Sequence, residues 1–331
     1  MVAKGHSKRL IWPIVALGML LLLNMLFTPG FFRLEMKNGR LYGSSVDILN
    51  RAAPVAIVCL GMTLVIATGG VDLSVGALMG ISGSVAALLV TRTEHPLSVV
   101  VLLSISLCVL AGLLSGALVS WLGVQPIVAT LVLMVSGRGV AQLMTDGQII
   151  TFRHAGFEFI GGGSLFCLPF TVTLVLAALL VTAVLTRKTV LGLFIEAVGD
   201  NPTASKYAGV AVHGVKVFVY GFSGLCAAIA GLIVTSDIRA ADASNAGLYL
   251  ELDAILAVVI GGTALTGGRF SLIGSLIGAL IIQTLTTTIL TRGVPVEHTL
   301  VVKALVVLAV CLLQSDRFRD LFVKRSRRNS P

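Results

Sequence analysis

The chain is poor in charged residues and in the groups that enzymes use for chemistry. Asp, Glu, Lys and Arg make up 12% of its 331 residues, about half of the ~25% found in soluble domains. The five histidines lie in tails or loops and share no metal-ligand spacing. The sequence has no P-loop, so the chain cannot itself drive a process with a nucleotide. These absences argue against a soluble protein, a histidine-based metal site and a nucleotide-hydrolysing enzyme.

Cysteine is scarce as well. The chain has five cysteines, an odd number, and most of them lie well inside apolar runs. Those inside the runs are Cys59, Cys108, Cys226 and Cys311. This placement predicts small packing residues rather than a disulfide framework or a metal site.

Apolar sequence, by contrast, is abundant: 56% of the residues are hydrophobic and the mean hydropathy is +1.01. Runs of about 18 apolar residues are long enough to cross the ~30 Å hydrocarbon core as helices. The pattern predicts an all-α fold, a polytopic membrane helix bundle with about ten transmembrane helices. The expected spans are 10–27, 52–68, 74–90, 97–119, 127–144, 168–186, 217–236, 254–265, 272–290 and 299–313. The eighth, 254–265, reaches across only when its flanking residues are included.

The hydrophilic segments define the expected organisation. A basic tail (1–9) precedes a transmembrane domain (10–314), which contains a long polar segment (187–216), and a second basic tail (315–331) follows. Placing both termini in the cytoplasm puts 14 Lys and Arg residues on that side and 8 on the other, in agreement with the positive-inside rule. The net charge of +9 therefore sets orientation and does not indicate nucleic-acid binding.

Residues 68–76 separate two apolar runs and contain a glycine pair, a carboxylate and a serine. Gly69 or Gly70 can end one helix, and Asp72 can cap the next by accepting a hydrogen bond from the amide of Ser74 or of the residue after it. The alternative is direct contact between Asp72 and a transported solute. With both termini inside, the interruption falls on the cytoplasmic side, which favours the cap.

The glycines of this interruption recur later in the chain with the same spacing. Glycines 69, 70, 76 and 80 recur at 267, 268, 274 and 278, in each case 198 residues later. This recurrence is either an internal repeat, of the kind that commonly flanks a transport path, or a chance match in a glycine-rich chain.

Two basic residues fall inside the expected spans. Arg138 can extend its stem along the lipid and place its head at the outer surface, or it can form an ion pair in the interior. Lys303 is close to a helix end, where the first of these arrangements is favoured even more.

The polar segment 187–216 contains one further recognisable element. Residues 202–209 predict a short surface helix that begins at Pro202 and stops at Gly209. A rigid helix of this kind would allow a membrane subunit to transmit force from a soluble motor protein. The alternative is that the segment is a solvated loop.

Several short motifs between residues 48 and 313 are typical of one family. They are GMT at 61–63, GGVDLSVG at 69–76, ATL at 129–131 with RG at 138–139, EAVG at 196–199 with Asn201 and Ala204, ELDAI at 251–255, GGT at 261–263 and GGR at 267–269. With these motifs the chain strongly resembles the permease subunits of ATP-binding-cassette importers for monosaccharides, the ribose, xylose and galactoside type. The stretches 50–56, 186–189 and 240–248 make it most similar to permeases of the galactofuranose type.

The resemblance implies a non-catalytic permease in the bacterial inner membrane that moves a monosaccharide into the cytoplasm by alternating access. It implies cytoplasmic ATPase partners that carry ATP and Mg, a periplasmic sugar-binding protein and a second permease subunit, identical or different. No cofactor, metal or nucleic acid is implied for this chain.

The resemblance also implies two groups of functional residues. The residues expected to contact the ATPase are Glu196, Ala197, Gly199, Asn201, Ala204 and Tyr207; the chain departs from the family's fuller E-A-A pattern at Val198. The residues expected to shape helix breaks near the inner gate are Gly69, Gly70, Asp72, Ser74, Gly267 and Gly268.

Two other classes of protein give different expectations. A secondary transporter driven by an ion gradient predicts carboxylates or histidines in mid-span, and only Asp72 comes near that. An intramembrane enzyme predicts Asp, His or Ser groups that converge at one depth, and none are visible in the sequence.

Overall fold

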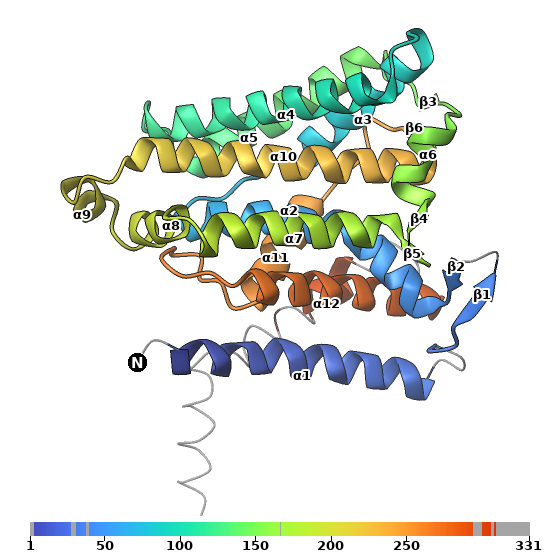
Figure 1. Ribbon diagram of the computed structural model, residues 1–331, viewed down its shortest axis with the longest axis horizontal. Helices are drawn as coiled ribbons and strands as arrows, with labels where there is room; N and C mark the ends of the chain where they lie inside the picture. The colour runs from blue at the N-terminus through green and yellow to red at the C-terminus, as the bar shows by residue number, and fades with distance from the viewer. Residues whose placement is uncertain are drawn as a thin grey trace, which may run out of the picture.

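The computed structural model describes residues 3–27, 31–37, 40–165, 167–293, 300–305 and 308. Figure 1 shows long helices that run roughly along one common axis. The long helices are α1 (Ala3–Phe27), α2 (Ser44–Ala67), α3 (Val75–Arg92), α4 (Leu97–Ser120), α5 (Pro126–Met144), α7 (Phe170–Arg187), α10 (Val212–Ile238) and α12 (Leu272–Thr291). The shorter ones are α6 (Ala155–Gly162), α8 (Leu191–Asp200), α9 (Pro202–Tyr207) and α11 (Leu250–Ile260).

In the described part of the chain, six short strands form three antiparallel pairs. They are β1 (Glu35–Lys37) with β2 (Arg40–Tyr42), β3 (Ile150–Thr151) with β6 (Ala240–Ala241), and β4 (Ser164–Leu165) with β5 (Leu168–Pro169). The β3–β6 pair joins two loops that are far apart in the sequence, with Ile150 opposite Ala241. All three pairs lie at the end of the bundle opposite α8 and α9 (Figure 1).

Seven of the described helices are long and apolar enough to cross a membrane, and the apolar part of α1, Ile11–Phe27, is only slightly shorter. The protein is therefore a polytopic helical membrane protein, as the composition predicted. The total of ten spans and the cytoplasmic termini stay predictions. Most of the expected tenth span, 299–313, and the tail 315–331 lie outside the described residues.

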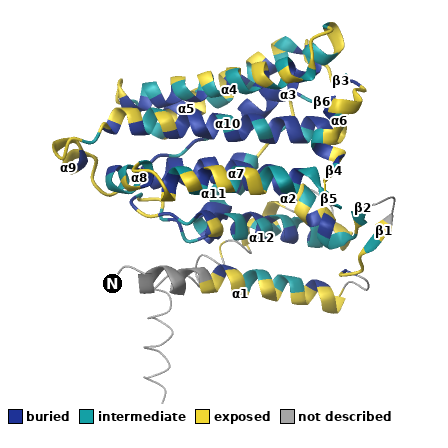
Figure 2. Cartoon of the chain, in the orientation of Figure 1, coloured by how far each residue is buried: buried dark blue, intermediate teal, exposed yellow. Residues whose placement is uncertain are grey.

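Helices α2 and α10 form the centre of the bundle. Every residue of α2 from Ala52 to Ala67 is buried, because this part of the helix is apolar on all sides. Helix α10 packs against α2, α3 and α4, and small residues permit the close approach: the Gly112 position of α4 lies against the Tyr220 carbonyl. Figure 2 shows this buried centre in dark blue, with exposed residues along α1, α4, α5 and α7.

Three boundaries differ from the sequence-based expectation. Helix α2 begins at Ser44, eight residues before the expected start of the second span. Helix α1 already begins at Ala3, so most of the basic tail 1–9 continues this helix. Helix α11 spans only 11 residues, about 16 Å at 1.5 Å per residue, which is about half of the hydrocarbon core.

The expected eighth span, 254–265, is helical only as far as Ile260, because Gly261 and Gly262 follow in a turn. The polar residues that precede α11 form turns as well. The Asp242 carboxylate accepts hydrogen bonds from the backbone amides of Ser244 and Asn245, both at 3.0 Å. Such local bonds stabilise turns in competition with a helix. The chain consequently runs from β6 into the bundle as a turn-rich segment, residues 242–249, before α11 begins.

Candidate functional site

Helices α8 and α9 lie at one end of the bundle, the same end at which α1 begins (Figure 1). Helix α8 packs against α2, α7 and α10 and turns Gly192, Ile195 and Val198 toward them, a spacing that places all three on one helical face. Glu196 and Ala197 are half-buried between this face and solvent.

Helix α9 forms within the segment where a surface helix was predicted. The Asn201 side chain caps it by accepting a hydrogen bond from the Ala204 amide at 2.9 Å, and Gly209 follows its end with a φ of 84°, which suits glycine. Asn201 and Ala204 are exposed, and Tyr207 is 89% exposed. These three predicted contact residues therefore share an accessible surface.

The backbones of the two helix breaks and of α8 meet directly. The Gly268 amide donates a hydrogen bond to the Ala67 carbonyl at 2.9 Å. A Cβ on Gly267 would lie 2.9 Å from both the Gly199 carbonyl oxygen and the Gly69 nitrogen. Only glycine fits at such distances. Gly69, Gly199, Gly267 and Gly268, which come from both predicted groups, therefore form one backbone cluster.

Gly70, Asp72 and Ser74 lie apart from that cluster, against α10. A Cβ on Gly70 would be 2.5 Å from the Tyr220 hydroxyl, and that hydroxyl donates to the Val71 carbonyl at 3.3 Å. The extended backbone between α2 and α3 is thus sheltered by protein, as a non-helical segment in a membrane bundle must be.

Asp72 is fully buried and makes the expected hydrogen bond. Its Oδ1 accepts from the Ser74 amide at 3.0 Å and from the Ser74 hydroxyl at 2.6 Å. Among the described residues, Asp72 Oδ2 and the Ser223 hydroxyl have no hydrogen-bond partner, although Ser223 faces the carboxylate. Burial raises the pKa of Asp72 above its usual value, and the hydrogen bonds from Ser74 oppose this only in part.

The Arg138 guanidinium binds backbone carbonyls, whereas the favoured arrangement placed its head in water at the outer surface. Its Nη1 donates to the carbonyls of Ala243 (3.0 Å) and Ala246 (2.5 Å), so the guanidinium satisfies backbone groups of the segment 242–249.

Lys303 also differs from the expectation of a side chain that extends to the surface. Its Nζ lies 2.9 Å from Asp253 Oδ2, and both side chains are largely buried, with 12% and 22% exposed. The ion pair connects α11 with the described residues 300–305, and it was missed because its two members are 50 positions apart in the sequence.

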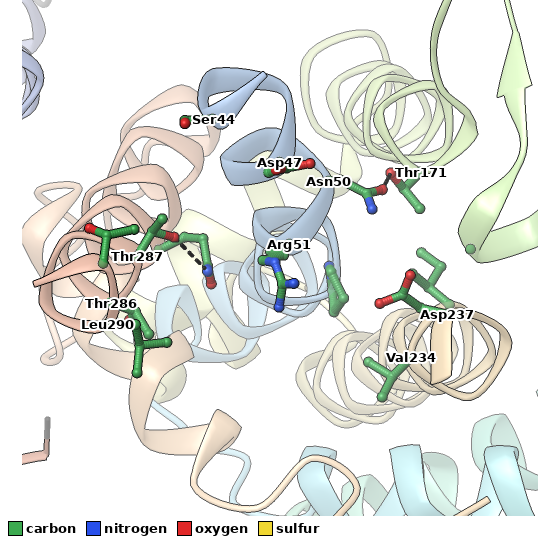
Figure 3. Close-up of a pocket in the computed structure, with 15 residues that line it drawn as sticks. Ser44, Asp47, Asn50, Arg51, Thr171, Val234, Asp237, Thr286, Thr287 and Leu290 are labelled. Atoms are coloured by element: carbon green, nitrogen blue, oxygen red, sulfur yellow. Dashed lines mark hydrogen bonds between the residues drawn. The ribbon is translucent and has the colours of Figure 1, made fainter. Parts of the chain in front are cut away.

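A polar cavity of about 570 Å³ opens at the other end of the bundle, away from α8 and α9. Figure 3 shows side chains from α2, α7, α10 and α12 around it. Its lining residues are Ser44, Asp47, Asn50, Arg51, Pro54, Gly161, Thr171, Ile233, Val234, Asp237, Gln283, Thr286, Thr287, Leu290 and Thr291. Sequence reasoning missed it; the polar last turns of α12 and the early charges of α2 were the available signals.

The described part of the chain has no group of three or more His, Cys, Asp and Glu residues that could hold a metal ion. Its polar groups instead serve helix ends, a non-helical segment and one cavity. This arrangement suits the passage of a solute rather than a covalent reaction.

Comparison with known proteins decides the family. Residues 44–311 match the family described as "Branched-chain amino acid transport system / permease component". The chain belongs to this permease family. The permease is 54% identical to the galactofuranose transporter permease protein YtfT of Escherichia coli (strain K12), over 95% of its own length and 94% of the relative's.

Two further relatives are also sugar permeases by name. The fructose import permease protein FruF of Bifidobacterium longum (strain NCC 2705) is 37% identical, with 99% of the permease and 94% of the relative covered. The ribose import permease protein RbsC of Haemophilus influenzae is 36% identical, with 90% of each chain covered. The resemblance drawn from the short motifs is confirmed. No solved structure matches the permease.

Membership of this family makes the chain a non-catalytic transport subunit and a multi-pass protein of the inner membrane. The polar features described above are therefore elements of a transport subunit rather than of an active site.

Proposed function

We propose that the permease is the membrane-spanning subunit of an ATP-driven importer that moves a monosaccharide, galactofuranose, from a periplasmic binding protein to the cytoplasm by alternating access. The observation that carries this proposal is the 54% identity, over nearly the whole of both chains, to a permease named for galactofuranose transport. The relatives named for fructose and ribose import support the sugar class.

In the proposed orientation, α8, α9 and the start of α1 lie at the cytoplasmic end and both termini are cytoplasmic. The distribution of Lys and Arg along the chain supports this assignment. The total of ten crossings is part of the same proposal, with the segment 242–249 and α11 together forming one crossing. The two helix breaks then lie at the cytoplasmic end, near an inner gate.

The proposed coupling element is the surface of α8 and α9. Asn201, Ala204 and Tyr207 are exposed there, so they are available to a cytoplasmic ATPase subunit that binds ATP and Mg. Gly199, on the other side of α8, lies against the backbone of both breaks. A displacement of α8 by the ATPase therefore reaches the breaks through backbone contacts alone.

A second permease subunit completes the proposed path. The turn-rich segment 242–249 exposes Ser244 and Asn245 in the non-helical half of the α11 crossing. Polar groups within a membrane bundle need water or protein beside them, and a partner permease, identical or different, would supply this shelter.

The proposal is tested by reconstituting the permease with its ATPase and binding protein in vesicles. We expect sugar uptake that requires ATP, and ATPase activity that falls when Tyr207 is replaced by alanine. Uptake without ATP, or ATPase activity indifferent to changes at Asn201 and Tyr207, would contradict it. Uptake by the permease alone that a protonophore abolishes would instead support the alternative, a secondary transporter driven by an ion gradient.

A further inference from the structure

The polar cavity reaches well below the ends of the helices that surround it. Arg51 lies seven residues into α2, and Gln283 lies eight residues before the end of α12. At 1.5 Å per residue these side chains start about 10–12 Å below the helix ends. Arg51 is exposed and Gln283 is half-buried, so both side chains can bind a polar solute that enters the cavity.

Two opposite charges face each other across this cavity without touching. Arg51 on α2 and Asp237 on α10 both line it, and Figure 3 shows them on facing helices. They attract each other, yet among the described residues no contact within 4.0 Å joins the guanidinium to the carboxylate. Because both side chains line the cavity, a molecule bound in it can hydrogen-bond with both.

The charges and hydrogen-bonding groups of the lining residues determine which class of molecule the cavity can bind. Asp47, Asp237 and Arg51 are its charged residues, so the cavity carries a net charge of −1 and repels anions. Gln283 and the threonines of α12 add neutral donors and acceptors. A hydroxyl group both donates and accepts, so a neutral polyol can satisfy the carboxylates and the guanidinium together.

The remaining lining and the size agree with a monosaccharide. Pro54, Ile233, Val234 and Leu290 provide an apolar wall, which suits the C–H face of a sugar ring. The volume of about 570 Å³ lies within the range of about 300–1,000 Å³ that small-molecule sites occupy.

We propose that this cavity is a binding site for a neutral monosaccharide, in which Arg51 and Asp237 hold the ring hydroxyls from opposite sides and Gln283 adds a third polar contact. The identification of the ligand as the transported sugar rests on the proposed function. In the proposed orientation the cavity opens to the periplasm and receives the sugar before it passes between the helices.

Protection of an engineered cysteine tests the proposal without any partner protein. Thr287→Cys places a thiol in the cavity, in a background where Cys167 and Cys311 are serine; the other three cysteines are buried. The permease is placed in phosphatidylcholine vesicles, which lack anionic polyol headgroups, and treated with a cationic, membrane-impermeant methanethiosulfonate. His95→Cys, in the exposed loop between α3 and α4, is the control.

We expect galactose to slow the modification of Thr287→Cys about tenfold at ten times its dissociation constant, because only the empty fraction reacts. Galactose 6-phosphate should give no protection, and His95→Cys should react at one rate throughout. Asp237→Asn should raise the galactose concentration needed about tenfold. Asp146→Asn, at an exposed carboxylate outside the cavity, should leave that concentration unchanged.

Equal rates of modification with and without galactose would overturn the proposal, as would equal protection by the phosphorylated sugar. Ser44→Cys at the rim of the cavity repeats the test if Thr287→Cys does not fold. A failure of the proposed function is seen separately, as the absence of ATP-dependent uptake by the unmodified permease with its partners, and leaves the protection assay interpretable.

Discussion

Replacing Gly199 by alanine adds one methyl group to the contact between α8 and the two helix breaks. Its Cβ would overlap the Ala67 carbonyl oxygen and lie 2.5 Å from the Gly268 nitrogen. Both neighbours are backbone atoms, so no change of side-chain rotamer relieves the overlap. We therefore expect the 2.9 Å hydrogen bond from Gly268 to Ala67 to lengthen or break.

The size of the effect follows from three terms. Overpacking at a rigid contact costs about 1–3 kcal/mol, and the loss of a backbone hydrogen bond costs about 1 kcal/mol more. The better helix propensity of alanine offsets about 1 kcal/mol of this. We expect Gly199→Ala to lower the free energy of unfolding by about 1–3 kcal/mol.

Thermal unfolding of the purified permease in detergent measures this change through the temperature at which the monodisperse gel-filtration peak is lost. Gly139→Ala is the matched control, because Gly139 also lies in a helix and has no atom within 4 Å of its Cβ position. We expect the control to unfold at or slightly above the temperature of the unmodified permease, and Gly199→Ala well below it. Equal unfolding temperatures for the two variants would refute the close backbone packing.

Three further predictions concern polar groups of the bundle. Asp72→Asn keeps the acceptor for Ser74 and removes a buried charge, so it should be at least as stable as the unmodified permease, whereas Asp72→Ala should lose about 1–3 kcal/mol; equal unfolding temperatures for the two variants would contradict this. Arg138→Met leaves two carbonyls without their donor and should lower the free energy of unfolding by about 3 kcal/mol, measured in the same assay. Arg138→Lys should recover part of this loss. An unchanged unfolding temperature for Arg138→Met would show that these bonds do not contribute to stability. Asp242→Ala removes the acceptor of the Ser244 and Asn245 amides and should cost about 1–3 kcal/mol. Asp242→Asn keeps a side-chain oxygen that can accept these bonds and should lose less; equal unfolding temperatures for the two variants would argue against this.

Local signals in the sequence predicted the surface helix well. Pro202 and Gly209 act within a few residues of themselves, as a first turn and a stop, so their meaning does not depend on the rest of the fold. The cap from Asn201 is equally local, although it was not predicted. The hydrogen bond between Asp72 and the Ser74 amide is local in the same sense. Such features can be read from spacing alone.

Contacts between distant segments could not be read in this way. Arg138 was expected to extend toward the surface because its acceptors, the carbonyls of Ala243 and Ala246, lie more than 100 positions away and leave no side-chain signature. Lys303 and Asp253 were missed as a pair for the same reason. Hydropathy also placed a span at 254–265 without showing that its helix ends at Ile260.

The polar cavity was missed for a different physical reason. Its members are scattered over α2, α6, α7, α10 and α12, and each one taken alone is typical of a helix end near the membrane surface. Arg51 was counted only as a loop charge, because the helix was expected to begin at Ala52. The earlier start at Ser44 places Arg51 on the helix itself, where its exposed side chain lines the cavity.

The contact of Arg138 with main-chain carbonyls has a consequence for how this sequence can change over time. Any residue at positions 243 and 246 offers the same carbonyl oxygen, so the guanidinium restricts the path of the backbone there and not the identity of the side chains. Homologous chains that keep the arginine are therefore free to vary both positions within the limits of packing. A search for compensating substitutions opposite Arg138 would find none, even though the contact is maintained.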